Sequence, residues 1–361
     1  MVRVKRAPRA HPSDSGAKIF LRHMTFNRHY LVVLQVTLIF LCFGLYLMVR
    51  SWEEKAYASI HMVDAASPTS AFSVAHSNKP YLLYGTAWKK EQTAKFVSQA
   101  VHSGFRFIDT ACQPRHYNEP GVGDGWTSAA QDLGLNREDF FLQTKFTPPN
   151  GQDHNNMPYD LHDPIPTQVS ISLKTSLKNL HTDYLDSWVL HSPYEDGDDT
   201  LKAWRAMEEA VDDGMVKQLG ISNCYDAEHF KWLYKVAKHK PKVLQNRFYS
   251  QTNFDPELRA FCKEHGIKYQ TFWTLTINKD ALATNEVKQW AEAKGLTPQT
   301  YMYAFLMSLG YATPLSGTTS LRHMAEDVAV MERMQNGAVF FETDEELKRF
   351  ARVLGMDENS L

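Results

Sequence analysis

The stretch FFLQTKFTPPNGQDHNNMPYDLHDPIPTQVSISLKTSLKNLHTDYLDSWVLH, residues 140–191, contains one strand–helix–strand unit. Its two ends, residues 140–146 and 187–191, are short runs rich in apolar and β-forming residues, which is typical of buried strands. Between them, large apolar residues recur at steps of four and three, as on one face of a helix: Val169, Leu173, Leu177 and Leu180. Because parallel strands need a crossover helix, this unit predicts two parallel strands with a helix packed on the outside of the sheet.

The same alternation continues on both sides of this stretch. A second helical stripe is formed by Leu201, Trp204, Met207 and Val211. The predicted strands are Tyr81–Gly85, Phe105–Asp109, Phe140–Phe146, Ser187–His191, Val216–Asn223, Val243–Phe248, Ile267–Trp273 and Ala312–Thr318. Eight strands with helices between them predict an α/β fold, a (β/α)8 TIM barrel over residues 80–361. A doubly wound open sheet is the alternative, but no G-x-G-x-x-G follows the first strand.

Composition limits the possible functions. With 361 residues, of which 43% are hydrophobic and 22% charged, the chain can bury a large core. Residues 1–55 contain nine Lys or Arg and three Asp or Glu, so the remainder carries −8 of a whole-chain charge of −2. A mildly acidic body argues against a nucleic-acid partner. Four irregularly spaced cysteines without a C-x-x-C pair indicate neither a metal site nor a disulfide framework.

One apolar segment lies near the N-terminus. Residues 30–49 contain no charged side chain, and a helix of this length spans about 30 Å, the thickness of a bilayer core. The sequence therefore predicts a basic tail over residues 1–28, a transmembrane helix over residues 29–50 and a stalk over residues 51–79. We expect a single-pass membrane protein with a lipid bilayer as partner. A cleaved signal peptide and a mitochondrial presequence are alternatives, and the basic tail favours a cytosolic N-terminus.

Polar residues occupy the predicted carboxyl ends of several strands: Asp109, Lys145, His191, Ser222 and Asn223. In TIM barrels this end carries the catalytic residues. Tyr117 follows in the loop after the second strand. A lysine paired with a carboxylate beside a phenol favours the phenolate, so we expect a lowered pKa for Tyr117, which would make it a general acid near neutral pH. Taken singly, each residue also fits an ordinary structural role, as a cap, a surface ion pair or a core histidine.

Seven motifs follow one another in order between residues 79 and 355. They are YGTAW (84–88), GFRFIDTA (104–111), NEPGVG (118–123), QTKF (143–146), LHSP (190–193), LGISN (219–223) and GTTS (317–320). Together they are highly specific, and on them the sequence resembles the aldo-keto reductase family. The resemblance implies reduction of a small-molecule carbonyl substrate by a nicotinamide cofactor, with NADPH expected and NADH possible.

The resemblance also implies roles for single residues. Asp109, Tyr117, Lys145 and His191 match the family's catalytic tetrad, in which the tyrosine donates a proton to the substrate carbonyl oxygen and the histidine orients that carbonyl. Trp88 matches an aromatic wall of the substrate pocket. Ser222, Asn223 and Gln245 match positions that bind the nicotinamide carboxamide, and Phe272 matches the ring that stacks on the nicotinamide. The other positions that match the cofactor site are Gly85, Thr86, Gly317, Thr318, Thr319, His323, Glu326 and Asp327.

The sequence departs from the family pattern in three places. Pro114 and His116 stand where the tyrosine is expected relative to the aspartate and to Asn-Glu, so Tyr117 is shifted by one residue. Gly317 and His323 replace two cations that usually bind the adenosine 2′-phosphate, although Arg322 is adjacent. Trp273 replaces a small residue after the stacking aromatic.

Two further questions stay open from the sequence. The 20-residue loop between Thr147 and Pro166 contains five prolines, and it is either a functional lid or a surface insertion. The membrane segment and the shifted Tyr117 also leave an alternative function, a cofactor-binding redox sensor or regulatory subunit with little turnover.

Overall fold

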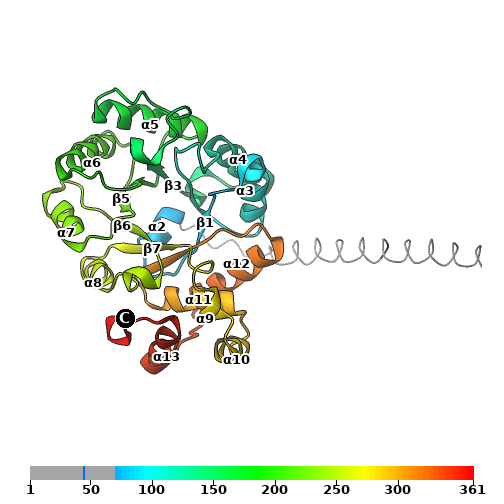
Figure 1. Cartoon of the computed structure of the whole chain (residues 1–361). Helices are drawn as coiled ribbons and strands as arrows, with labels where there is room; N and C mark the ends of the chain where they lie inside the picture. Colours follow the sequence, from blue (N-terminus) through cyan, green and yellow to red (C-terminus); the bar gives the residue numbers. More distant parts are fainter. Residues whose placement is uncertain (1–43, 45–69) are drawn as a thin grey trace, which may run out of the picture. The chain divides into compact units, whose positions relative to one another are not determined.

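The computed structural model describes Gly44 and residues 70–361, and eight parallel strands in that part close a barrel in chain order (Figure 1). The strands are β1 Leu83–Gly85, β2 Phe107–Asp109, β3 Phe141–Phe146, β4 Ser187–Leu190, β5 Leu219–Ser222, β6 Val243–Arg247, β7 Lys268–Phe272 and β8 Ala312–Ser316. Pairing of Leu83 with Leu315 closes the barrel between β1 and β8. All eight predicted strands are present, each within three residues of its predicted ends, so the barrel is confirmed.

Helices surround the barrel between successive strands (Figure 1). They include α3 Thr93–His102, α4 Glu119–Leu133, α5 Ile165–Asn179, α6 Gly197–Asp212, α7 Ala227–Val236, α8 Pro256–His265 and α12 Leu321–Gln335. Between β7 and β8 the chain adds α9 Lys279–Leu282, α10 Asn285–Ala293 and α11 Pro298–Ser308, and α13 Asp344–Leu354 follows α12. The predicted stripes face the sheet, because Val169 and Leu173 of α5 and Trp204 and Met207 of α6 are buried.

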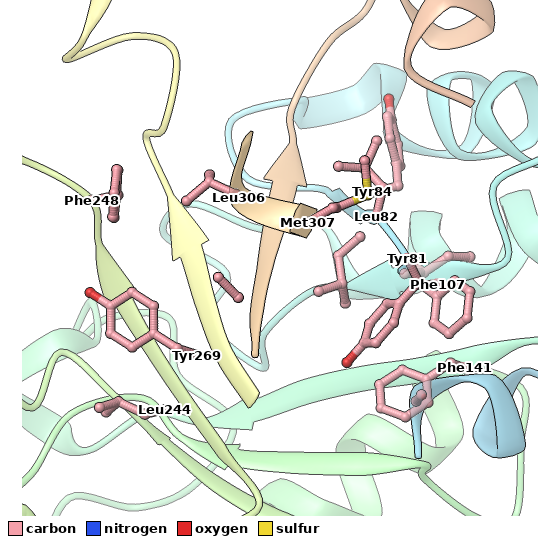
Figure 2. Close-up of a cluster of buried hydrophobic side chains, with 14 of the residues drawn as sticks. Tyr81, Leu82, Tyr84, Phe107, Phe141, Leu244, Phe248, Tyr269, Leu306 and Met307 are labelled. Carbon is pink, nitrogen blue, oxygen red and sulfur yellow. The ribbon is translucent and has the colours of Figure 1, made fainter. Parts of the chain in front are cut away.

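Large side chains fill the barrel in layers. Near the amino ends of the strands, the Tyr81 and Phe107 rings stack with centroids 4.5 Å apart, and Phe107 lies 5.7 Å from Phe141 (Figure 2). The next layer is polar, since the side-chain amides of Gln143 and Gln245 both donate to the Gln270 carbonyl oxygen, at 2.6 and 2.9 Å. The interior up to this layer is therefore a packed core, and the catalytic residues of such barrels lie beyond it, at the carboxyl ends of the strands.

The last part of the predicted stalk belongs to the folded body. Helix α2, Ala71–Ala75, buries both of its terminal alanines. The Phe72 ring stacks on Phe141 of β3 at 6.3 Å, and the Lys217 ammonium lies 4.7 Å from the Phe72 ring. The segment predicted as a stalk, residues 51–79, therefore includes a short helix at residues 71–75 that packs on the barrel. Five residues are too short for a periodic pattern, and their helix is stabilised by packing on the barrel.

The N-terminal expectations fall outside this description. Contacts divide the chain into Met1–Ala66 and Ser67–Leu361, and the barrel lies in the second unit. Among the described residues, no helix combines the length and apolar character that crossing a bilayer requires. The predicted basic tail (1–28), and the transmembrane segment (29–50) except Gly44, lie outside the described residues.

Candidate active site

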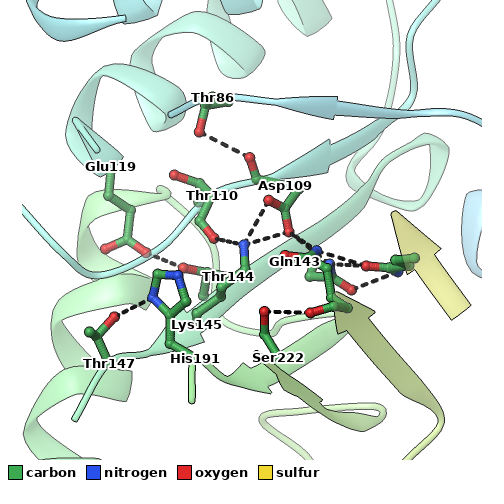
Figure 3. Close-up of polar contacts among 12 residues, drawn as sticks. Thr86, Asp109, Thr110, Glu119, Gln143, Thr144, Lys145, Thr147, His191 and Ser222 are labelled. Atoms are coloured by element: carbon green, nitrogen blue, oxygen red, sulfur yellow. Dashed lines mark hydrogen bonds and ion pairs between the residues drawn. The ribbon is translucent and has the colours of Figure 1, made fainter. Parts of the chain in front are cut away.

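A buried ion pair lies at the centre of the carboxyl end of the barrel. Asp109 ends β2 and Lys145 belongs to the neighbouring strand β3, and both side chains are almost completely buried. The Lys145 ammonium donates to both Asp109 carboxylate oxygens at 2.7 Å and to the Thr110 carbonyl at 2.8 Å (Figure 3). An ammonium has three N–H donors, so all three are engaged within the protein.

Two glutamine side chains hold the carboxylate from the interior side. Gln143 and Gln245 donate to Asp109 Oδ1 at 2.7 and 2.9 Å. Burial lowers the pKa of Lys145, and the nearby Asp109 carboxylate opposes this shift. With its hydrogen bonds satisfied, the pair is held in one geometry, and removal of either partner would leave an unpaired buried charge.

Tyr117 lies beside this pair but is not hydrogen-bonded to it. The Lys145 ammonium is 5.6 Å from the centre of the Tyr117 ring, and the rings of Tyr117 and His191 meet edge to face at 5.9 Å. Burial and the Asp109 charge raise the pKa of Tyr117. The expected lowering of the Tyr117 pKa is therefore wrong. Desolvation penalises the phenolate, and the positive charge of Lys145 is largely offset by the Asp109 carboxylate to which it is bonded.

His191 directly follows β4 and completes the group. Its Nδ1 is 2.7 Å from the Thr147 hydroxyl (Figure 3). Burial and, second, the charge of Lys145 lower the pKa of His191 well below its usual value, so the ring is neutral near pH 7. Tyr117 and His191 thus present a protonated phenol and a neutral imidazole side by side.

A cavity of about 480 Å³ reaches this group at Tyr117, whereas Asp109, Lys145 and His191 are not among its lining residues. It is lined by Trp88 and Tyr117, and the long loop contributes Asn156, Met157 and Pro158. The Trp88 ring lies 4.0 Å from the His116 ring. Gln113 donates to the Gly151 carbonyl of this loop at 2.6 Å, and within the loop Tyr159 donates to the Thr147 carbonyl at 2.5 Å. The loop thus borders the cavity, and its role as a lid stays a prediction.

The positions expected to hold the nicotinamide lie on neighbouring strands. Ser222 ends β5, and its hydroxyl donates to the Gln245 carbonyl at 2.7 Å, while the Asn223 amide donates to the His191 carbonyl at 2.9 Å. The Gln245 side chain points toward Asp109 and Gln270. Gly85 and Thr86 follow β1, where the Thr86 hydroxyl donates to the Asp109 carbonyl at 2.9 Å. Phe272 ends β7.

A second cavity, of about 530 Å³, lies between the segments that follow β7 and β8. Five of the expected cofactor residues line it together with Trp273: Gly317, Thr318, His323, Glu326 and Asp327. Thr319 is exposed and is not among its lining residues. The amino end of α12, capped by Ser320, opens at this cavity, and its free N–H groups favour an anion. These features fit the adenosine phosphate end of a dinucleotide.

The charges around this cavity are partly neutralised. Arg322, the expected substitute cation, is ion-paired with Glu326 at 3.0 Å. Asp327 accepts a hydrogen bond from the Ser316 hydroxyl at 2.7 Å, and burial raises the pKa of Asp327 to about 7.

The sequence did not indicate two cationic residues, Lys89 and Arg247, that lie near the predicted cofactor positions. Lys89 is buried, donates to the Gly317 carbonyl at 3.0 Å, and has its pKa lowered to about 8 by burial. Its place next to Trp88 in the first motif was the available signal. Arg247 ends β6, and its guanidinium lies 5.7 Å from the Phe272 ring. No sequence pattern indicated a functional role for Arg247, because an arginine at the end of a strand is equally typical of an exposed surface residue.

Comparison with known proteins identifies the family. Residues 81–339 match the Aldo/keto reductase family. Glycerol 2-dehydrogenase (NADP(+)) of Hypocrea jecorina is 31% identical over 264 residues, covering 64% of this chain and 77% of that protein. Methylglyoxal reductase DkgB of Yersinia pestis is 29% identical over 248 residues, covering 67% and 83%. Against the Bacillus subtilis oxidoreductase YtbE and glyoxal reductase, the match spans only 56% and 64% of the relatives' lengths.

Solved structures give the same result for the fold. An aldo-keto reductase from a Medee basin deep-sea metagenome superposes with a TM-score of 0.60 at 26% identity, covering 76% of this chain and 90% of that one. A Bombyx mori aldo-keto reductase in complex with NADP gives 0.61 at 21% identity, covering 75% and 88%, which shows the shared fold alone. Because the family match covers most of the barrel and includes every strand, the chain belongs to the aldo/keto reductase family.

Proposed function

We propose that this protein reduces aldehyde or ketone carbonyls to alcohols with NADPH, and that Tyr117 donates the proton. Carbonyl reduction with a nicotinamide cofactor is the general chemistry of the family. The observation that carries the proposal is the convergence of Tyr117 and His191 on the Asp109–Lys145 pair beside a cavity lined by Trp88.

Each residue has a distinct task in this proposal. None of the described residues hydrogen-bonds the Tyr117 hydroxyl, so it is available to a substrate carbonyl. Its raised pKa keeps it protonated across the neutral range. When it gives up the proton, the nearby Lys145 ammonium stabilises the phenolate. The neutral His191 positions the carbonyl with the ring nitrogen that does not contact Thr147.

The cofactor supplies the hydride to the carbonyl carbon when it is bound. Ser222, Asn223 and Phe272 would hold its nicotinamide, and the cavity at the amino end of α12 would hold its adenosine phosphate. NADPH is the proposed form because relatives such as the Hypocrea jecorina dehydrogenase are named as NADP-dependent. NADH remains a usable second cofactor in this proposal, because few free cations surround that cavity.

Turnover on a generic aldehyde tests the proposal. We expect 4-nitrobenzaldehyde to drive steady oxidation of NADPH, measured by the loss of absorbance of the reduced nicotinamide. The alternative, a redox-sensing membrane subunit, is favoured by the shift of Tyr117 and by its raised pKa. Tight NADPH binding without turnover on several aldehydes and ketones would support that alternative.

We also propose that residues 29–50 anchor the protein in a membrane as a single span. The support is the uncharged run over residues 30–49. The full-length protein should resist carbonate extraction from membranes. Recovery of the full-length protein in the soluble fraction would contradict the anchor.

A further inference from the structure

The Arg247 guanidinium lies among aromatic rings at the mouth of the barrel. Arg247 ends β6 and pairs in register with Phe272, which ends β7. Its guanidinium carbon is 4.2 Å from the centre of a Trp273 ring, 5.3 Å from that of Tyr249 and 5.7 Å from that of Phe272. Side chains alternate along a strand, so Arg247 lies on the same face as Gln245, whose amide points into the barrel. Arg247 therefore lies one layer above the polar core, at the carboxyl end.

This guanidinium has no anionic partner in the described part of the chain. Its Nε is buried and makes no hydrogen bond, and no ion pair joins Arg247 to a carboxylate of those residues. Arg247 as a whole is half-buried, and leaving its buried Nε–H unpaired is costly. An anion bound at the guanidinium would supply the partner that the described residues do not.

Aromatic stacking alone would not indicate an anion site, because a second arginine of the chain is stacked in the same way. Arg349 of α13 stacks on Trp290 at 4.1 Å and also has a buried Nε without a partner. Arg349 differs in its place, because helices α10 and α13 lie outside the barrel (Figure 1). Location at the strand ends distinguishes Arg247.

Arg247 neighbours residues assigned to both ends of the predicted cofactor site. Two residues before it on β6, Gln245 belongs to the nicotinamide end. Trp273, on which the guanidinium stacks, also lines the cavity that contains Thr318 and His323. A dinucleotide that places its nicotinamide at Phe272 and its adenosine phosphate near His323 must therefore carry its diphosphate past Trp273.

We propose that Arg247 binds the diphosphate of the nicotinamide dinucleotide, with Trp273 holding the planar guanidinium in place. The inference rests on the proposed function, since it assumes a dinucleotide in this cleft. The fork of parallel N–H groups matches two phosphate oxygens, and this pairing is charge-assisted. Arg322 is paired with Glu326, and the Lys89 ammonium is bound to the Gly317 carbonyl, so Arg247 is the better placed cation.

The test is the affinity of Arg247→Gln for dinucleotides, measured by calorimetry without substrate. We expect Kd to rise about tenfold or more for NADPH and NADH alike, because both contain the diphosphate. Adenosine 2′-monophosphate, which lacks a diphosphate, should bind both proteins equally. The salt dependence of NADPH binding should also become shallower in the variant. Arg247→Lys should fall between the two proteins, because it keeps the charge and loses the fork.

Controls separate the possible failures. Arg349→Gln removes an equally stacked arginine and should leave every Kd unchanged, and thermal unfolding of both variants reports any loss of packing. A rise in Kd for NADPH alone would place Arg247 at the 2′-phosphate and overturn the proposal. Unchanged Kd values with a higher KM for 4-carboxybenzaldehyde, but not for benzaldehyde, would overturn it in favour of a substrate carboxylate. If the wild-type protein binds no dinucleotide, the proposed function itself fails.

Discussion

Every donor of the Lys145 ammonium is used inside the protein, and this determines how Tyr117 can act. Asp109 and the Thr110 carbonyl take all three N–H groups. Lysine therefore influences the phenol through its charge, at 5.6 Å from the ring, and not through a hydrogen bond. The result is an acid that stays protonated until a carbonyl oxygen accepts its proton.

Replacing Tyr117 with Phe should abolish most carbonyl reduction and leave cofactor affinity nearly unchanged. Only the hydroxyl is lost, and a positioned general acid contributes roughly 10²–10⁴ in rate. His116→Phe should do much less, because the His116 ring stacks on Trp88 and its lowered pKa, caused by burial and Arg115, leaves it neutral. The measurements are kcat with a generic aldehyde and Kd for NADPH. A more damaging His116→Phe would show that the proton donor has been assigned to the wrong residue.

The positions of the strands could be predicted from the sequence, but the contacts of the side chains inside the barrel could be predicted only in part. Buried parallel strands are continuous apolar runs, so all eight were located to within three residues. Asp109 and Lys145 were expected to meet because they lie at the carboxyl ends of neighbouring strands. The glutamine layer beneath them, the raised pKa of Tyr117 and the place of Arg247 depend on depth in the barrel. Sequence periodicity gives the face of a strand but not how far each side chain is from water.

Helix α12 makes the stability of the cofactor-free protein depend on pH. Burial raises the pKa of Asp327 from 3.8 to about 7, so the folded state favours the protonated acid. The stabilising contribution is complete below pH 4 and is lost as the pH rises toward 7, at about 1.4 kcal/mol per pH unit at most. Asp327→Asn should remove this loss and stabilise the protein at pH 8 relative to wild type. Urea unfolding at pH 5 and pH 8 measures the difference, and an equal effect of the substitution at both pH values would refute the assignment.

The segment between β8 and α12 should also set only a weak preference for NADPH over NADH. Arg322 is paired to Glu326, and Gly317 and His323 stand where fixed cations are expected, so few free positive charges face a 2′-phosphate. We therefore expect discrimination of about tenfold, or about 1.4 kcal/mol.

Introducing cations at the two positions where the family usually has them tests this preference for NADPH. Gly317→Lys and His323→Arg should raise the preference for NADPH, because each adds a fixed positive charge near the 2′-phosphate. The lysine can be accommodated, because Gly317 is exposed and a Cβ there would meet nothing within 4 Å. Discrimination of a thousandfold in the native protein would mean that another cation binds the 2′-phosphate.

At the scale of the whole molecule, the folded body begins before the first strand. Helix α2 contributes Ala71, Phe72 and Ala75 to the core at the amino end of the barrel. Its removal would uncover the Phe141 ring and deprive Lys217 of its aromatic neighbour. The boundary that matters for a stable catalytic unit is therefore near Ser67 and not near the predicted start at residue 80.

Two truncations test this boundary. A chain that begins at Ser67 should fold, remain soluble and keep full activity, because it retains α2 and every described element that builds the site. A chain that begins at Lys79 should unfold at a lower temperature, since exposing buried apolar side chains typically costs about 2–5 kcal/mol. Its KM for the carbonyl should stay unchanged in the cold, because α2 packs at the end of the barrel opposite the catalytic residues. Differential scanning calorimetry and steady-state kinetics on both chains provide the comparison, with Phe72→Ala in the longer chain as the matched control. Equal unfolding temperatures for the two truncations would show that α2 contributes nothing to the body and would return the boundary to residue 80.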